Sequence, residues 1–348
     1  MNNYSDRLIL FDSLKLFAIF LVLWGHTIQY LLSTEFADEP VYRMIYSFHM
    51  PLFMMITGFF FAKTFKSGFI NTTLKKFRQL IIPALVWSVL FSVLKTLKTG
   101  MPSLDYIIAN ISNGFWFLKS AFICCLLGYP ICKFLNYRVL LGGVIFCFSQ
   151  TPFDSSLQIS FMFPCFYCGM FLQWKYKYVR KMKLSIPLMI TGIIAVLGNL
   201  ALDSELYRLT FDAIYLRPVW QDASVIMLRL FRIILGISVS LFIIFAFEGI
   251  TRKMLEYTTL NKVIVMLGSE TLGIYILQSY LLEYLMARHL NFDNMPFATF
   301  NFVVAPAISL IILLISICII KTLKTNRYFA AILFGSRIQE CQKIDFAN

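Results

Sequence analysis

Long blocks of apolar residues, separated by short polar breaks, run through the whole chain. Most blocks are long enough to cross the hydrocarbon core of a bilayer as one α-helix. They predict about ten membrane-spanning helices. These lie near residues 8–32, 43–63, 79–97, 114–135, 139–151, 157–174, 184–202, 223–247, 263–285 and 297–320. The block at 139–151 is short and close to both its neighbours. The pattern therefore predicts an all-α integral membrane protein.

Composition and charge agree with this class. Of the 348 residues, 59% are hydrophobic and only 14% are charged, whereas about a quarter are charged in soluble domains. The net charge of +13 would suit a nucleic-acid-binding protein, but the basic residues lie in short loops between apolar blocks. Most of the 31 Lys and Arg occupy alternate loops, as the positive-inside rule requires of cytoplasmic segments. We therefore predict that both the N- and the C-terminus are cytoplasmic.

The breaks between the blocks are too short to hold a separate soluble domain. Residues 1–325 are predicted to form one multi-span domain, and residues 326–348 a cytoplasmic C-terminal tail. The tail contains a mildly amphipathic run, YFAAILFG, for which the inner membrane surface is an alternative location.

Ionisable residues lie inside the first predicted helix, where the bilayer makes them costly and where they commonly mark a functional site. Lys15 and His26 are eleven residues apart, so at about 100° per residue they share one face, with His26 about 16 Å further across the membrane. Asp12 and Gln29 lie near the same face. Asp12 and Lys15 also form an i,i+3 pair that can neutralise both charges.

Two interpretations of this face remain open. In the first, Asp12 and Lys15 are an interfacial ion pair, and His26 bonds a neighbouring helix. In the second, His26 is a general base, because an imidazole titrates near neutral pH.

The second predicted helix carries His49 about 9 Å below the outer surface, which is also the depth of His26. Two histidines at one depth can meet across an antiparallel helix pair. Pro51 would loosen the backbone beside His49 and free a carbonyl group. The alternative is a kink at which His49 is wetted from the outer loop.

The segment LKKFRQLIIP, at residues 74–83, is basic and lies at the predicted inner face. Lys75, Lys76 and Arg78 suit either plain membrane anchoring or an electropositive mouth for a phosphate-bearing ligand. A single CxxC pair, Cys165 and Cys168, is too little to predict a metal site. The sequence also shows no P-loop, nucleophile elbow or zinc-ligand cluster. We expect no bound metal and no bound cofactor.

Five motifs, taken in order, resemble the acyltransferase 3 family of bacterial membrane acyltransferases, which includes the fucose 4-O-acetyltransferase-like proteins. They are FDSLKLFAIFLVLWGHT, SFHMPLFMMITGFFF, KKFRQLIIPALVWS, FWFLKSAF and LGSETLGIYILQSYL. The resemblance extends from Phe11 to about Thr322. Three positions depart from the family pattern: Lys15 replaces the usual Arg, Thr57 the usual Ser, and Gln278 a frequent His. Lys15 keeps the charge but lacks the bidentate guanidinium.

The resemblance implies transfer of an acyl group, usually acetyl, from cytoplasmic acyl-CoA to a hydroxyl of a sugar or cell-surface glycan. It implies that His26 is catalytic and that the protein lies in the bacterial cytoplasmic membrane. Other residues would bind CoA or the acceptor, with the basic ones suited to the CoA phosphates and the aromatic ones to a sugar face. These are Asp12, Lys15, His49, Lys75, Lys76, Arg78, Trp116 and Tyr275.

A transporter or flippase of a sugar, lipid-linked sugar or organic anion is the alternative function. It would share the predicted spans and the buried charges. Transporters with inverted repeats usually carry paired spans broken by Gly or Pro in their two halves, and the sequence shows no convincing pair. The order of the motifs also favours the acyltransferase.

Overall fold

The computed structural model describes nine stretches of the chain, and their regular elements are all helical. The stretches are residues 3–32, 35–65, 68–99, 104–150, 155–183, 185–215, 222–254, 258–287 and 289–336. The structure thus confirms the predicted all-α class.

The α-helices of the described residues form the bundle, and all of them have 8 to 32 residues except α14, which has three. The first nine are α1 (Asn3–Leu31), α2 (Pro40–Thr64), α3 (Phe69–Lys76), α4 (Ile82–Thr99), α5 (Leu104–Asn113), α6 (Trp116–Lys133), α7 (Arg138–Ser149), α8 (Ile159–Lys181) and α9 (Ser185–Ala201). The later ones are α10 (Ser204–Tyr215), α11 (Ala223–Met254), α12 (Thr258–Ser269), α13 (Thr271–Ser279), α14 (Phe297–Thr299), α15 (Ala305–Lys324) and α16 (Arg327–Phe334). Three π-helical segments continue neighbouring helices: η2 (Phe77–Ile81), η6 (Tyr280–Met286) and η7 (Phe300–Val304).

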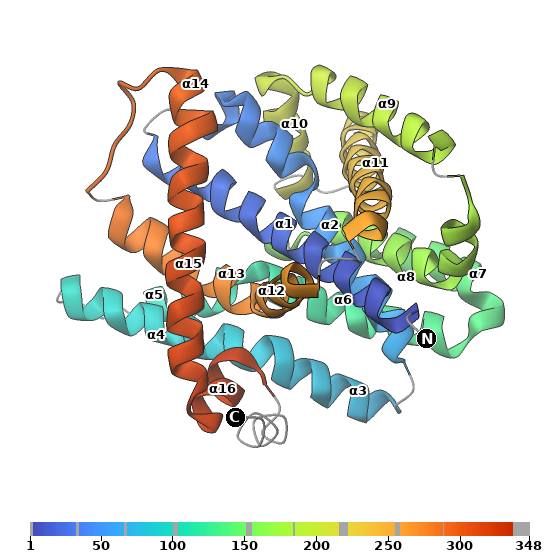
Figure 1. Ribbon diagram of the computed structural model, residues 1–348, viewed down its shortest axis with the longest axis horizontal. Helices are drawn as coiled ribbons and strands as arrows, with labels where there is room; N and C mark the ends of the chain where they lie inside the picture. Colours follow the sequence, from blue (N-terminus) through green and yellow to red (C-terminus); the bar gives the residue numbers. More distant parts are fainter. Residues whose placement is uncertain are drawn as a thin grey trace.

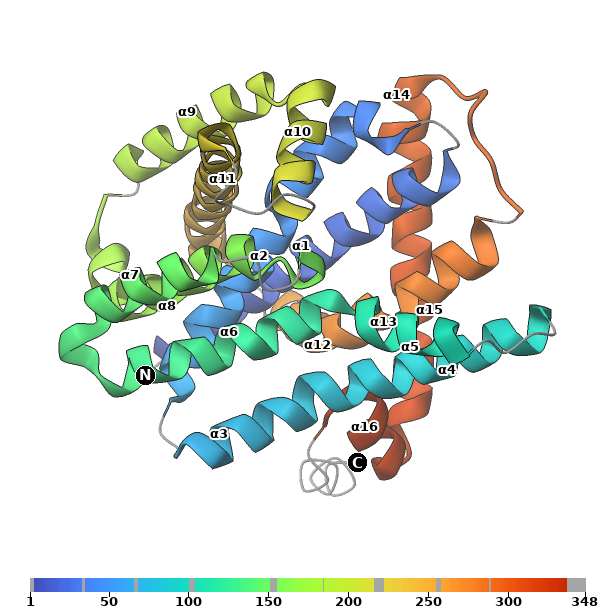
Figure 2. The same cartoon turned by 180° about the vertical axis from the view of Figure 1, so that it is seen from behind.

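Helices α1 and α2 run through the middle of the bundle, as Figures 1 and 2 show. Helix α1 packs against α2, α11, α12 and α15, and α2 packs most extensively against α8. Two glycines permit this last contact. A Cβ on Gly58 would lie 2.0 Å from the backbone oxygen of Phe166, and one on Gly169 would lie 2.0 Å from that of Met55. Small residues commonly allow such close backbone approach between membrane helices.

The count of spans differs from the prediction of about ten. Each predicted block contains a helix, but among the described residues six helices are long and apolar enough to cross a membrane. The number rises to eight if two bent pairs, α9 with α10 and α12 with α13, each count as one span. Helix α7 has only 12 residues. Helix α8 has 23, but Gln173 and Lys175 interrupt its apolar run.

The basic segment α3–η2 and helix α16 both lie at the bottom of Figure 1, whereas α10 and α14 lie at the top. The positive-inside rule makes the lower side cytoplasmic, which remains a prediction. In the region predicted as a tail, α16 packs on α4. There the indole nitrogen of Trp87 donates a hydrogen bond to the backbone oxygen of Leu333, at 2.9 Å.

Candidate active site

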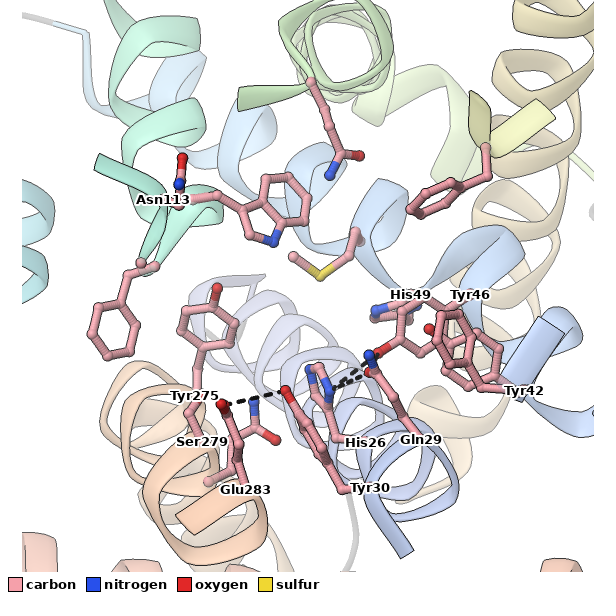
Figure 3. A pocket seen from close by; sticks show the side chains of 18 of the residues that line it. His26, Gln29, Tyr30, Tyr42, Tyr46, His49, Asn113, Tyr275, Ser279 and Glu283 are labelled. Atoms are coloured by element: carbon pink, nitrogen blue, oxygen red, sulfur yellow. Dashed lines mark hydrogen bonds between the residues drawn. The ribbon is translucent and has the colours of Figure 1, made fainter. Parts of the chain in front are cut away.

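Two neighbouring chambers lie between the central helices and the helices that surround them. The first is called the outer chamber, because it contains the two histidines predicted to lie in the outer half of the membrane, His26 and His49 (Figure 3); its volume is about 430 Å³. The second is called the inner chamber, because it contains Lys15 and Lys76 from the predicted cytoplasmic side; its volume is about 240 Å³. The long polar face predicted for α1 is therefore divided between two spaces.

His26 is held in one orientation by neighbours on α1 and α2. Its Nδ1 lies 3.0 Å from the side-chain oxygen of Gln29 and 3.2 Å from the hydroxyl of Tyr46, and the Tyr46 hydroxyl donates to the same Gln29 oxygen at 3.1 Å. The carboxamide oxygen only accepts hydrogen bonds, so Nδ1 carries the hydrogen. In the neutral imidazole Nε2 then keeps its lone pair, as a general base requires.

His49 is buried on α2, and its Nδ1 donates to the backbone oxygen of Ile45 at 2.9 Å. Its Nε2 is therefore also an acceptor when the ring is neutral. The rings of His49 and Tyr46 meet edge to face with centroids 4.4 Å apart. The structure thus brings together the two histidines that the sequence placed at one depth. Tyr46 lies between them, in contact with both rings.

Arg232 is buried beside Tyr46, on the wall of the outer chamber that also carries His49. The Nη2 of Arg232, on α11, donates to the backbone oxygen of Tyr46 at 3.4 Å, and its guanidinium lies 5.0 Å from the centre of the Tyr207 ring. Arg232 also lines the outer chamber. This wall therefore carries positive charge in a region of low dielectric, where it attracts anionic groups strongly.

The inner chamber combines cations with an apolar wall. The Lys15 ammonium donates to the Asp12 carboxylate at 2.9 Å, which confirms the predicted i,i+3 ion pair. Lys15 and Lys76 line the chamber together with mainly apolar side chains of α2, α6 and α13. Lys75 and Arg78, which the sequence grouped with them, lie outside the lining of both chambers.

The two chambers meet at Met50 and Tyr275, which line both of them. Trp116, the other aromatic residue predicted to face a substrate, lines the outer chamber only. Figure 3 shows Tyr275 at the edge of the outer chamber, on the side away from His49. These two shared side chains are therefore the boundary between a basic space and a space that contains two histidines.

Several lining residues were not predicted as site residues. Tyr30 follows His26 by four residues on α1, so helical spacing alone could have identified it. Gln278 was noted only as a departure from the family pattern. Glu283 lies beyond α13 in η6, and nothing in the sequence marks it as a neighbour of α1.

In the described part of the chain, no group of three or more His, Cys, Asp or Glu side chains is close enough together to hold a metal ion.

The chain is similar to known proteins at two levels. Residues 9–321 match the model of a family described as the acyltransferase domain. Among curated proteins, the nodulation protein NolL of Mesorhizobium japonicum is 27% identical over 205 residues, which are 52% of this chain and 55% of that protein. NolL of Sinorhizobium fredii is 36% identical over 95 residues, 26% of each chain.

The chain thus spans about half and about a quarter of the lengths of these two relatives. No solved structure matches it. The family match covers nearly the whole chain, including α1, α2 and the two chambers between them and their neighbours. This multi-pass membrane protein therefore belongs to the acyltransferase domain family, which confirms the family that its motifs predicted.

Proposed function

We propose that this protein is an O-acyltransferase that moves an acyl group from cytoplasmic acyl-CoA, through the inner chamber, to a sugar or glycan hydroxyl in the outer chamber. The observation that carries the proposal is the shared boundary of the two chambers. A donor held among Lys15 and Lys76 and an acceptor held beside His26 would meet at Met50 and Tyr275.

The inner chamber suits the donor. Its ammonium groups attract the phosphates of CoA, and its apolar wall, which includes Phe53 and Phe117, suits the pantetheine arm. The wide outer chamber suits a sugar, because it combines aromatic rings with amide and hydroxyl groups. Acetyl is the first acyl group to test.

The chemistry follows from the orientation of His26. Its Nε2 takes the proton of the acceptor hydroxyl while the hydroxyl oxygen attacks the thioester carbonyl carbon. The C–S bond then breaks, the ester forms, and the CoA thiolate leaves and takes the proton back from the imidazolium. The bonds from Nδ1 to Gln29 and Tyr46 keep the ring in place through both steps.

The test uses proteoliposomes that contain the full chain, with labelled acetyl-CoA on one side and surface glycan from cells lacking the gene on the other. We expect an added acetyl mass on the glycan and release of free CoA thiol. His26→Ala should lower both by about 100-fold or more, the usual size of a general-base contribution. The matched control is His289→Ala, which removes an exposed histidine outside both chambers.

Full transfer by His26→Ala would contradict the role of His26. Movement of the glycan or another solute across the membrane without release of CoA thiol would contradict the enzyme and favour a transporter. In cells, loss of an acyl mass from the surface glycans when the gene is deleted is the corresponding expectation, with the bacterial cytoplasmic membrane as the proposed location.

A further inference from the structure

The side of the outer chamber away from His49 is formed by one continuous face of α13 and η6. Tyr275, Gln278, Ser279 and Glu283 from this face all line the chamber. Figure 3 shows Tyr275, Ser279 and Glu283 on that face, with Glu283 reaching toward Tyr30 of α1. The face therefore presents polar groups to the chamber beside Tyr30 and His26 of α1.

Part of this face is π-helical. Residues Tyr280–Met286 form π-helix, in which each amide bonds the carbonyl five residues earlier. Glu283 lies in this segment, four residues after Ser279, so the two residues share one side of the helix. Single π-turns of this kind are frequent at functional sites.

Gln278 carries a buried hydrogen-bond acceptor without a donor. The residue is only 2% exposed, yet its side-chain oxygen has no hydrogen-bond partner within the described chain. Leaving a buried acceptor unpaired is energetically costly. A ligand that donates a hydrogen bond here would recover that energy.

Tyr30 connects Glu283 to His26, because it contacts both side chains. The Tyr30 hydroxyl donates to the Glu283 carboxylate at 3.3 Å, and the Tyr30 ring stacks on the His26 ring with centroids 5.7 Å apart and planes at 18°. A carboxylate has room for several further donors after it has accepted one hydrogen bond. Glu283 thus offers an acceptor one side chain away from His26, and Gln278 lines the same chamber.

We propose that Gln278 and Glu283 form a hydroxyl-binding subsite for the acceptor. It holds one hydroxyl of a vicinal diol while the adjacent hydroxyl faces His26. This inference rests on the proposed acyltransferase function and names the acceptor chemistry: an uncharged polyol edge, such as that of a neutral sugar. The Glu283 carboxylate repels a carboxylate or phosphate at this wall, so an anionic part of the acceptor would have to face elsewhere.

The test compares two small acceptors that differ in one hydroxyl, cis-1,2-cyclohexanediol and cyclohexanol. Ester formation from acetyl-CoA is measured with each, using the full chain in proteoliposomes. We expect the wild-type protein to have the lower KM for the diol. Gln278→Leu and Glu283→Gln should each raise the KM for the diol about tenfold, while kcat and the rate with cyclohexanol change little.

Two further variants separate a binding role from a structural one. Gln278→Glu keeps an acceptor at the same position and should restore most of the preference for the diol. Glu205→Gln changes an exposed glutamate on α10 outside the chamber and should leave both acceptors unaffected. Retained turnover of cyclohexanol shows that each variant is folded.

Equal use of diol and cyclohexanol by the wild-type protein, or an unchanged diol KM in both Gln278→Leu and Glu283→Gln, would overturn the subsite. Either result leaves the acyltransferase proposal standing when the glycan assay still shows transfer that depends on His26. Failure of the glycan assay itself, with no release of CoA thiol, would instead reject the proposed function.

Discussion

Gln29 accepts a hydrogen bond from Nδ1 of His26 at 3.0 Å, one helical turn further along α1. Tyr46 of α2 closes a triangle with these two side chains. A hydrogen-bond acceptor that fixes which imidazole nitrogen carries the hydrogen is a recurring feature of catalytic histidines. In the proposed mechanism Gln29 is therefore a positioning residue, because it holds the His26 ring.

Gln29→Leu removes this acceptor and should lower kcat about tenfold or more, because both the tautomer and the ring orientation lose their main restraint. The KM for acetyl-CoA should not change. Gln29→Glu keeps an oxygen at the same distance and should retain most of the activity. Steady-state kinetics of acetyl transfer test this, and equal loss in both variants would contradict a role in orienting Nδ1.

Lys15 and Lys76 are predicted to hold the phosphates of the donor. Lys15→Met or Lys76→Met should raise the KM for acetyl-CoA about tenfold to a hundredfold, the usual effect of losing a charge-assisted hydrogen bond. Lys15→Arg keeps the charge and should be nearly normal. Lys75→Met is the matched control, because Lys75 adjoins Lys76 in the chain but lies outside both chambers.

A donor without nucleotide phosphates sharpens this experiment. With acetyl-pantetheine, the Met variants and the unchanged protein should have the same KM. A rise in KM of similar size for both donors would show that the lysines act on the fold or on the acyl end of the donor.

Met50 and Tyr275 form the boundary that the acyl group would reach in the proposed reaction. Met50→Ala should therefore widen the range of usable donors, measured as the ratio of rates with butyryl-CoA and acetyl-CoA. Met50→Trp should block transfer with little change in donor KM. An unchanged ratio in Met50→Ala would place the meeting point elsewhere.

The contact between α2 and α8 predicts a strong effect on stability. In Gly58→Ala the new methyl group would lie 2.0 Å from a backbone oxygen, so one helix must shift. We expect a loss of at least about 1–3 kcal/mol, the usual cost of overpacking. Gly143→Ala is the control, because a Cβ there meets no atom within 4 Å. Thermal unfolding of the protein in detergent would measure both, and equal midpoints would contradict the close approach.

Patterns within single helices were read correctly from the sequence. The helical class and the pair of Asp12 and Lys15 follow from apolar length and helical spacing alone, because α-helical geometry repeats regularly along the chain. The number of spans stays a prediction, because an apolar block indicates a helix without showing whether it crosses the membrane. Helices α7 and α8 do not qualify as spans by length and composition.

The sequence by itself determined that this protein is a helical membrane protein with a histidine deep in its first span, and its motifs determined the family. Only the tertiary structure decided that Lys15 and His26 face different chambers, that Met50 and Tyr275 separate them, and that Glu283 stands beside Tyr30. The physical reason is that spacing along one helix follows from local geometry. Contacts between helices depend on which faces pack together.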